Sequence, residues 1–274
     1  KLTHPDIEKK HIKTGNLGFL DPFKIHKIKK VLKELSPDVV IINLPSDLKV
    51  AGIAARKAGV KKIIYRRGSA IPIKDTRLNR YIFRNYTDFI LTNSEETKKT
   101  ILVNNPELFD PQKIKVIYNG IDLKEYPDNL PKERFLQKSG KIILGNLARF
   151  SFQKGHDKLI SIAEILRNKG LDFHLYLAGD GELLQSTKKL VSEKKLDDHV
   201  TFLGFVNNTR SFLSNIDIFL MTSLWEGFGY AIAEAMACFK PVIGFDISSN
   251  PELIKDSVNG KLIKPFDINS FADC

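Results

Sequence analysis

Short apolar runs alternate with segments of helical periodicity along most of the chain. Helical spacing of apolar side chains is found at residues 23–35, 47–58, 76–86 and 95–102. Short apolar runs typical of buried strands lie at 37–44, 62–65, 88–92 and 114–118, and the alternation resumes from 141 to 262, with strands predicted at 141–145, 217–222 and 240–245. Strands that alternate with helices predict a parallel, doubly wound α/β fold.

A turn-rich segment at 119–131 interrupts this alternation, because Asn, Gly, Asp and Pro are concentrated in it. We expect one α/β domain in residues 1–125, a linker at 126–140 and a second α/β domain in residues 141–274, with a crevice between the domains. Open α/β sheets bind ligands at the carboxyl ends of their strands. Candidate chemistry is therefore sought in the loops that follow strands.

The composition is that of an ordinary soluble protein, with 42% hydrophobic and 27% charged residues. No run of about eighteen apolar residues is present, so no segment is predicted to span a bilayer. The cysteines, Cys238 and Cys274, favour a reducing compartment over a disulfide framework, and Cys and His lack the spacing of a metal site. We expect a cytoplasmic protein with no bound metal.

The net charge of +11 is unevenly distributed. Residues 1–140 hold 28 Lys and Arg against 16 Asp and Glu, whereas residues 141–274 hold 15 against 16. No recognition helix, aromatic stacking pattern or RNP-like motif accompanies this charge, so nucleic acid is not the expected partner. An anionic membrane surface or a phosphorylated acceptor suits the asymmetry, and a solvated basic face is the alternative.

Two glutamates flank a glycine-rich turn after the strand predicted at 217–222. In the run EGFGYAIAE, Glu226 and Glu234 stand eight positions apart. On one continuous helix they would lie about 12 Å apart along the axis and roughly 80° apart around it, which is too far to meet one small ligand. Gly227 and Gly229 favour a tight turn instead, with a helix that starts near Tyr230.

A helix start of this kind suits a phosphate joined to a sugar. Free backbone amides around Phe228 to Ala231 would attract an anion, and carboxylates beside them would accept hydrogen bonds from hydroxyl groups. The alternative is a surface glutamate followed by a helix whose alanines are simply core. The pattern alone leaves both interpretations open.

The wider sequence resembles retaining glycosyltransferase family 4. This family is marked by two glutamates with seven residues between them, and Glu226 and Glu234 match that pattern. Further segments resemble it in the same order: VIYNGID at 116–122, GNLAR at 145–149, QKG at 153–155, LAGDG at 177–181, FLGF at 202–205 and PVIG at 241–244. The resemblance implies the GT-B architecture, in which two Rossmann-like domains face a crevice, with the acceptor on the first and the nucleotide sugar on the second. It also implies that the chain is truncated at both ends.

The resemblance assigns roles to individual residues. Glu226 is expected to bind donor-sugar hydroxyls, and Arg149 and Lys154 to neutralise the donor diphosphate, so these three are the catalytic candidates. Donor contacts are implied at Glu234, where ribose hydroxyls are expected, and at Gly227, Phe228, Gly229, Tyr230, Gly179, Phe205, Val206 and Arg67. Arginine and lysine suit phosphate oxygens and stabilise the charge that grows on a leaving diphosphate.

Several of these positions have structural alternatives. Asp180, beside Gly179, also suits the cap of the helix that follows, and Phe205 and Val206 suit apolar packing beneath their loop. Arg66 and Arg67 stand near where many family members carry a histidine, and they suit a donor phosphate, an acidic acceptor or a solvated rim. His156 is interpreted as a loop residue.

The sequence therefore predicts a nucleotide-sugar-dependent glycosyltransferase that retains anomeric configuration and uses no metal or cofactor. A glycan or lipid-linked acceptor is expected, in the synthesis of bacterial lipopolysaccharide or another surface polysaccharide, by a protein peripheral on the inner membrane face. Two alternatives stay open: a nucleotide-sugar epimerase of the same architecture and a non-catalytic nucleotide-sugar-binding module.

Overall fold

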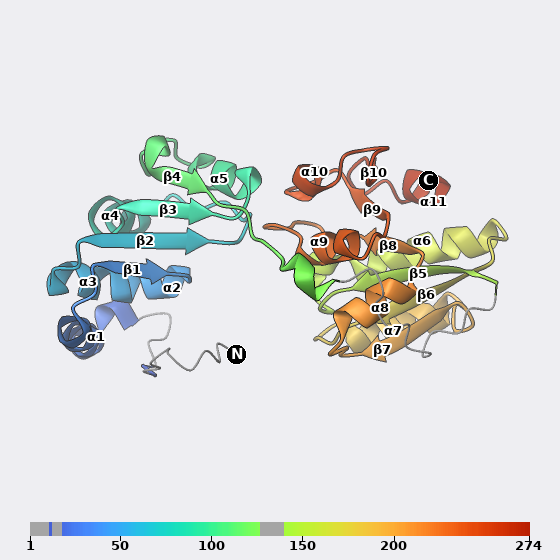
Figure 1. Ribbon diagram of the computed structural model, residues 1–274, viewed down its shortest axis with the longest axis horizontal. Coiled ribbons are helices and arrows are strands. Elements are labelled where there is room, and N and C mark those ends of the chain that lie inside the picture. The colour runs from blue at the N-terminus through green and yellow to red at the C-terminus, as the bar shows by residue number, and fades with distance from the viewer. Residues whose placement is uncertain (1–10, 13–17, 127–139) are drawn as a thin grey trace. The chain divides into compact units, whose positions relative to one another are not determined.

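The computed structural model describes residues 11–12, 18–126 and 140–274, which form two compact units (Figure 1). The first unit is Lys1–Ile117 and the second is Tyr118–Cys274. The linker predicted at 126–140 lies almost wholly outside the described residues and stays a prediction. Within the described ranges, no helix has both the length and the apolar character needed to span a bilayer.

The first unit holds a four-stranded parallel sheet of order β1-β2-β3-β4. Its strands are β1 (Val39–Ile42), β2 (Lys62–Arg67), β3 (Phe89–Thr92) and β4 (Ile114–Val116). Its helices are α1 (Pro22–Leu35), α2 (Pro45–Asp47), α3 (Ile53–Ala58), α4 (Arg77–Tyr86) and α5 (Glu95–Leu102), with 3-10 turns at Gly18–Leu20 and Pro111–Lys113. Ile63, Tyr65 and Arg67 are the buried residues of β2, because alternate residues of a strand point to the same face.

Local sequence accounts for helix boundaries in this unit, with one exception. Ser94 accepts a hydrogen bond from the amide of Thr97 at 3.0 Å and is the N-cap of α5. The single helix predicted at 47–58 is interrupted, since a π-helical turn, Leu48–Gly52, lies between α2 and α3. The wider turn lets Leu48 pack in the main core of the unit and Val50 in the cluster that contains Ile28.

The second unit holds a six-stranded parallel sheet of order β10-β9-β8-β5-β6-β7. Its strands are β5 (Ile142–Leu147), β6 (Phe173–Ala178), β7 (Val200–Gly204), β8 (Ile218–Met221), β9 (Val242–Phe245) and β10 (Gly260–Ile263). Its helices are α6 (His156–Asn168), α7 (Leu184–Glu193), α8 (Thr209–Asn215), α9 (Tyr230–Ala237), α10 (Asn250–Leu253) and α11 (Ile268–Asp273), with 3-10 turns at Leu123–Glu125 and Phe152–Lys154.

Both faces of this second sheet are covered. Leu175 and Leu177 of β6 lie in one core cluster, and Tyr176 and Ala178 lie in another, so apolar layers form on both sides. The strand order reverses between β5 and β8, which are neighbours although β6 and β7 separate them in sequence. The predicted α/β class with parallel sheets is confirmed, and the reversal marks the place where such sheets bind ligands.

Candidate functional site

The candidate site is formed by two loops that follow β5 and β8 in the second unit. The loop at 148–155 carries Arg149 and Lys154, and the loop at 222–229 carries Glu226. Because β5 and β8 are adjacent parallel strands, both loops leave the same edge of the sheet. The topology thus joins Lys154 to Glu226 across a separation of 72 positions in sequence.

Hydrogen bonds hold these two loops together. The amide of Leu224 donates to the carbonyl of Gln153 at 2.7 Å, and the Gln153 side-chain amide donates to the carbonyl of Trp225 at 2.8 Å. The Thr222 hydroxyl donates to the carbonyl of Lys154 at 3.2 Å. These reciprocal bonds fix the backbone around Lys154.

Gly155 permits this close approach of the loops. Its φ is +61°, and a Cβ at this position would lie 2.3 Å from the carbonyl oxygen of Thr222. The residue ends the 3-10 turn Phe152–Lys154 and directly precedes α6. Any side chain here would push the two loops apart, so glycine is required.

Lys154 and Glu226 form an ion pair between the two loops. Lys154 Nζ donates to Glu226 Oε1 at 2.5 Å, and their side chains are 21% and 9% exposed. The hydroxyls of Ser248 and Ser249 donate to the carbonyl of Glu226 at 2.7 and 3.2 Å. A pair this protected from water is little screened by salt. In the part of the chain that the structure describes, no group of three or more His, Cys, Asp or Glu is placed to hold a metal ion.

Four other residues predicted as site residues surround one pocket of about 500 Å³: Arg149, Gly179, Phe205 and Val206. The Arg149 side chain is 73% exposed and forms an ion pair with Glu182 at 3.0 Å. Phe205 is 75% exposed, so apolar packing beneath its loop is the wrong interpretation for this side chain. A mostly apolar hollow with two charged residues, Arg149 and Asp180, in its lining has the composition of a small-ligand site.

Gly179 shapes this pocket through its backbone. Its φ is +141°, and a Cβ there would lie 1.9 Å from the carbonyl oxygen of Ala148. A Cβ at Gly181 would likewise lie 2.4 Å from the carbonyl oxygen of Phe150. Between the two glycines, the Asp180 carboxylate accepts from the amide of Gly181 at 2.7 Å, and α7 begins without a side-chain cap. The alternative that Asp180 caps this helix is therefore wrong.

Glu234 lies in α9, which begins at Tyr230 as predicted. The Tyr126 hydroxyl donates to Glu234 Oε1 at 3.4 Å. Burial raises the pKa of the Glu234 carboxyl. No side chain caps α9, and in its first turn the amides of Ile232 and Ala233 donate to the Gly229 carbonyl at 3.0 and 3.2 Å.

The turn before α9 consists of Gly227, Phe228 and Gly229, and its Gly229 has a φ of +89°. The Phe228 ring is buried and packs edge-on against Tyr230, with ring centroids 5.3 Å apart, while Tyr230 is half exposed. A ligand at this turn would therefore meet backbone and the Tyr230 side chain rather than the Phe228 ring.

Arg67 lies in the first unit, at the end of β2. It is 7% exposed, while its neighbour Arg66 is exposed, so a solvated rim is the wrong interpretation for Arg67. The Arg67 guanidinium donates to the Tyr65 hydroxyl at 3.3 Å and to the Ile71 carbonyl. Its assignment to the donor stays a prediction.

His156 is the first residue of α6 rather than a loop residue. It is 3% exposed, and its ring stacks on Phe150 with centroids 4.1 Å apart. Burial, with a smaller contribution from the Lys154 charge, lowers the His156 pKa to about 4. The imidazole is therefore neutral near pH 7 and packs as a core aromatic ring.

Sequence patterns missed the residues that support the predicted ones. Gln153 belongs to the QKG segment, and its polar side chain beside the Lys-Gly pair could have indicated a supporting role for it. Ser248 and Ser249 stand 22 and 23 positions from Glu226, and no spacing rule links them to it. Tyr126, which contacts Glu234, is 108 positions away from it and lies within the turn-rich segment at 119–131.

Two family models match the sequence. The model described as "Glycosyl transferases group 1" matches residues 129–274, and the model described as "Glycosyltransferase Family 4" matches residues 6–125. The first match contains both loops of the candidate site, and the second contains the first sheet.

Similar proteins agree with these models. The chain is 28% identical over 200 residues to the poly(ribitol-phosphate) alpha-N-acetylglucosaminyltransferase of Staphylococcus aureus, covering 70% of this chain and 38% of that protein. It is 29% identical over 259 residues to the UDP-Gal:alpha-D-GlcNAc-diphosphoundecaprenol alpha-1,3-galactosyltransferase of Escherichia coli, covering 88% and 66%. The chain thus spans less than two thirds of the length of these curated relatives.

Solved structures show the same fold. Anabaena HepE in complex with UDP-glucose matches with a TM-score of 0.79 and 25% identity over 95% of this chain and 73% of that chain. The lipopolysaccharide outer core galactosyltransferase WaaB in its apo form matches with a TM-score of 0.73 and 24% identity over 95% and 71%. These likenesses show the GT-B fold that the sequence predicted.

Proposed function

This chain belongs to the group 1 glycosyl transferases, and we propose that it moves a sugar from a nucleoside-diphosphate sugar to a glycan or lipid-linked acceptor, with retention of configuration. The observation that carries this proposal is the Lys154–Glu226 pair where the strand order of the second sheet reverses. The UDP-linked donors named for the E. coli relative and for HepE support a UDP-sugar as the donor.

We assign the donor to the second unit. The pocket of about 500 Å³ suits the nucleotide, with its base against Phe205 and Val206 and its diphosphate near Arg149 and Gly179. The ribose hydroxyls are assigned to Glu234. The start of α9 offers amides to the phosphates, which favours an anion there.

Lys154 is assigned to the diphosphate and Glu226 to the donor sugar. An ammonium group carries three N–H donors, and Lys154 gives one of them to Glu226, so others remain for diphosphate oxygens. Glu226 in turn accepts from hydroxyls of the donor sugar. An ion pair that is already held in place needs little rearrangement during the reaction.

The proposed reaction proceeds on one face of the sugar. The bond between the anomeric carbon and the diphosphate oxygen breaks, the acceptor oxygen bonds to that carbon on the same face, and the acceptor proton passes to the departing phosphate. Negative charge grows on the diphosphate as it leaves, so Arg149 and Lys154 stabilise the transition state more than the bound substrate. No side-chain nucleophile, metal or cofactor takes part in this scheme.

The relatives guide the choice of acceptor. The S. aureus relative is named for a poly(ribitol-phosphate) acceptor and the E. coli relative for a diphosphoundecaprenol-linked one. A surface polysaccharide such as lipopolysaccharide is the proposed product. The basic surplus of residues 1–140 suits an anionic acceptor or membrane surface, and supports a cytoplasmic protein that is peripheral on the inner membrane face.

The test measures UDP release and sugar transfer by the complete protein, with UDP-glucose, UDP-galactose and UDP-N-acetylglucosamine as donors. Glu226→Gln and Arg149→Ala should each lower kcat/KM by roughly 100-fold or more, because each removes a group aimed at the reacting donor. Glu193→Ala, at an exposed glutamate of α7, is the matched control and should leave the rate unchanged. Unchanged rates in the first two variants would overturn the assignment.

Two outcomes would favour the alternatives. Conversion of one nucleotide sugar into another without any acceptor would indicate an epimerase. Donor binding by calorimetry with no turnover for any donor and acceptor would indicate a non-catalytic binding module.

A further inference from the structure

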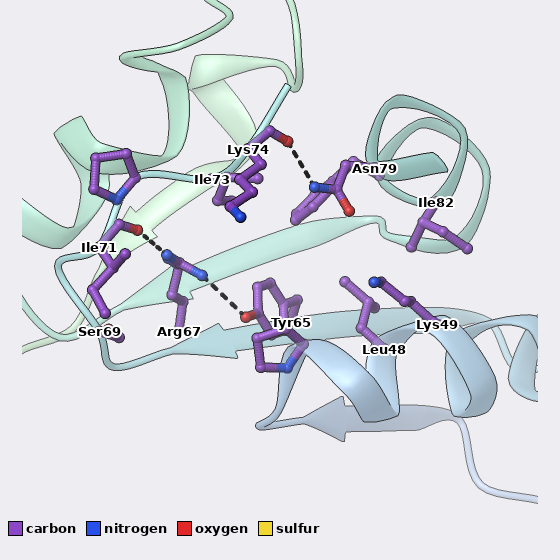
Figure 2. A pocket seen from close by; sticks show the side chains of 13 residues that line it. Leu48, Lys49, Tyr65, Arg67, Ser69, Ile71, Ile73, Lys74, Asn79 and Ile82 are labelled. Atoms are coloured by element: carbon purple, nitrogen blue, oxygen red, sulfur yellow. Dashed lines mark hydrogen bonds between the residues drawn. The ribbon is translucent and has the colours of Figure 1, made fainter. Parts of the chain in front are cut away.

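A second pocket, of about 310 Å³, lies in the first unit at the carboxyl end of β2 (Figure 2). Three segments line it: α2 together with the π-helical turn that follows, the loop after β2, and α4. Leu48, Ile73, Ile82 and Phe83 give it apolar walls. The volume of the pocket and its apolar walls therefore suit a hydrocarbon group.

The charged groups of this pocket are all cationic. Arg67, Lys49 and Lys74 line it, and no Asp or Glu is among its described lining residues. Arg67 is buried with two neutral partners, the Tyr65 hydroxyl and the Ile71 carbonyl, which Figure 2 shows on either side of the guanidinium. Within the described structure its Nε is buried without a hydrogen-bond partner.

This arrangement leaves a charge uncompensated. A guanidinium stays protonated in proteins, and burying a cation without a counter-ion is costly. The carboxylate next to Lys74 in sequence, Asp75, does not supply the counter-charge, because it accepts from Arg80 at 2.7 Å and from Asn105 at 2.9 Å. An anion from outside the chain would satisfy the site.

We propose that this pocket binds an amphiphilic anion, with a phosphate or carboxylate group at Arg67 and an apolar body against Leu48, Ile82 and Phe83. The planar fork of arginine matches both kinds of oxyanion, and Lys74 adds a second cation from the loop. That this anion belongs to the sugar acceptor rests on the proposed function. The binding site itself rests only on the pocket.

The test is calorimetric titration of the whole protein, without donor, with n-octyl phosphate as probe. Inorganic phosphate presents the anion alone, and 1-octanol presents the apolar body alone. We expect n-octyl phosphate to bind at least about 10-fold more tightly than either, because only it uses the cations and the apolar walls together. Binding no tighter than that of 1-octanol would overturn the proposal.

Variants locate the binding. Arg67→Met should weaken n-octyl phosphate binding by roughly 10-fold or more. Since Arg67 also holds the loop through Ile71, two substitutions at exposed positions of the pocket keep the test independent of folding: Ile71→Asp, which adds a negative charge, and Lys74→Gln, which removes a positive one. Each should weaken binding several-fold.

The matched control is Lys57→Gln on α3, which makes the same charge change at an exposed position outside the pocket and should leave binding unchanged. Equal affinities for the Lys57→Gln and Lys74→Gln variants, with no effect of Ile71→Asp, would place the anion elsewhere and refute the site.

Vesicles distinguish the two sources of such an anion. Flotation with phosphatidylcholine vesicles, with or without phosphatidylglycerol, is compared for the same variants. Loss of binding to the anionic vesicles in Ile71→Asp and Lys74→Gln identifies a lipid headgroup, and retained vesicle binding with lost n-octyl phosphate binding identifies a separate amphiphile. Both outcomes support the pocket, and neither depends on whether the protein transfers sugar.

Discussion

Replacing Lys154 with methionine should destabilise the second unit by about 3 kcal/mol, because it leaves the Glu226 carboxylate buried without its partner. The two charged atoms lie 2.5 Å apart. At an effective dielectric constant of about 20, their attraction is roughly 6–7 kcal/mol. Loss of hydration offsets much of this, and because the Lys154 side chain keeps 21% of its exposure, the net effect falls near the lower end of the range for broken buried pairs.

A double-mutant cycle separates the pair from other effects. Glu226→Gln should cost about 2 kcal/mol, and the double variant with Lys154→Met about 3 kcal/mol rather than the sum of about 5, which gives a coupling near 2 kcal/mol. The pair Lys189–Glu193 is the control, with side chains 79% and 57% exposed and an N···O distance of 3.6 Å. Its coupling should stay below about 0.5 kcal/mol.

The assay is urea unfolding followed by tryptophan fluorescence. Trp225 is the one tryptophan of the chain and precedes Glu226, so the signal reports the second unit even where the two units unfold separately. With an m-value of about 2 kcal/mol per molar urea, Lys154→Met should lower the midpoint by about 1.5 M. A shift below about 0.3 M, or additive effects in the cycle, would refute the view that the pair is shielded from water.

Two further predictions use the same unfolding assay. Gly179→Ala should lower the free energy of unfolding by more than about 3 kcal/mol, because its Cβ would lie 1.9 Å from the Ala148 carbonyl oxygen. Gly170→Ala is the control, since Gly170 has a positive φ but open space around it, and it should cost about 1 kcal/mol. Equal losses of stability would contradict the steric reason. The pKa of His156 is about 4 in the folded state and about 6.5 in the unfolded state. Its contribution to the free energy of unfolding should therefore be complete above about pH 6.5. Up to roughly 3 kcal/mol of it should be lost as the pH falls toward 4. His156→Phe should flatten the dependence of the urea midpoint on pH in this window, and an unchanged slope would assign it to other groups.

Periodicity was sufficient to predict most of the elements. The strand at 217–222 and the helix that begins at Tyr230 appear as β8 and α9, because a buried strand and a glycine-led helix start are local features of the sequence. The π-helical turn Leu48–Gly52 was not predictable in this way. Its apolar residues keep a helical spacing, and only their packing into two different clusters distinguishes the wider turn.

The partners of the candidate catalytic residues were less predictable than the residues. Arg149 and Lys154 stand close together in one loop, yet the first is paired with Glu182 and the second with Glu226. The second pairing depends on β5 lying beside β8, a choice of strand order that no local pattern encodes. The burial of Arg67 next to an exposed Arg66 follows the alternation of β2, which becomes visible once the strand is known to extend to residue 67.

The main-chain contact between Gly179 and Ala148 limits how the proposed nucleotide pocket could be changed by substitution. Both residues line the pocket of about 500 Å³, and there the carbonyl of one meets the Cα of the other with no room for a side chain. That part of the lining cannot be redesigned by substitution without unfolding the loop. Phe205, Val206 and Asn207, on the segment after β7, line the same pocket with replaceable side chains. A directed-evolution library for new donor bases is therefore best confined to this segment, where sequence can vary while the scaffold persists.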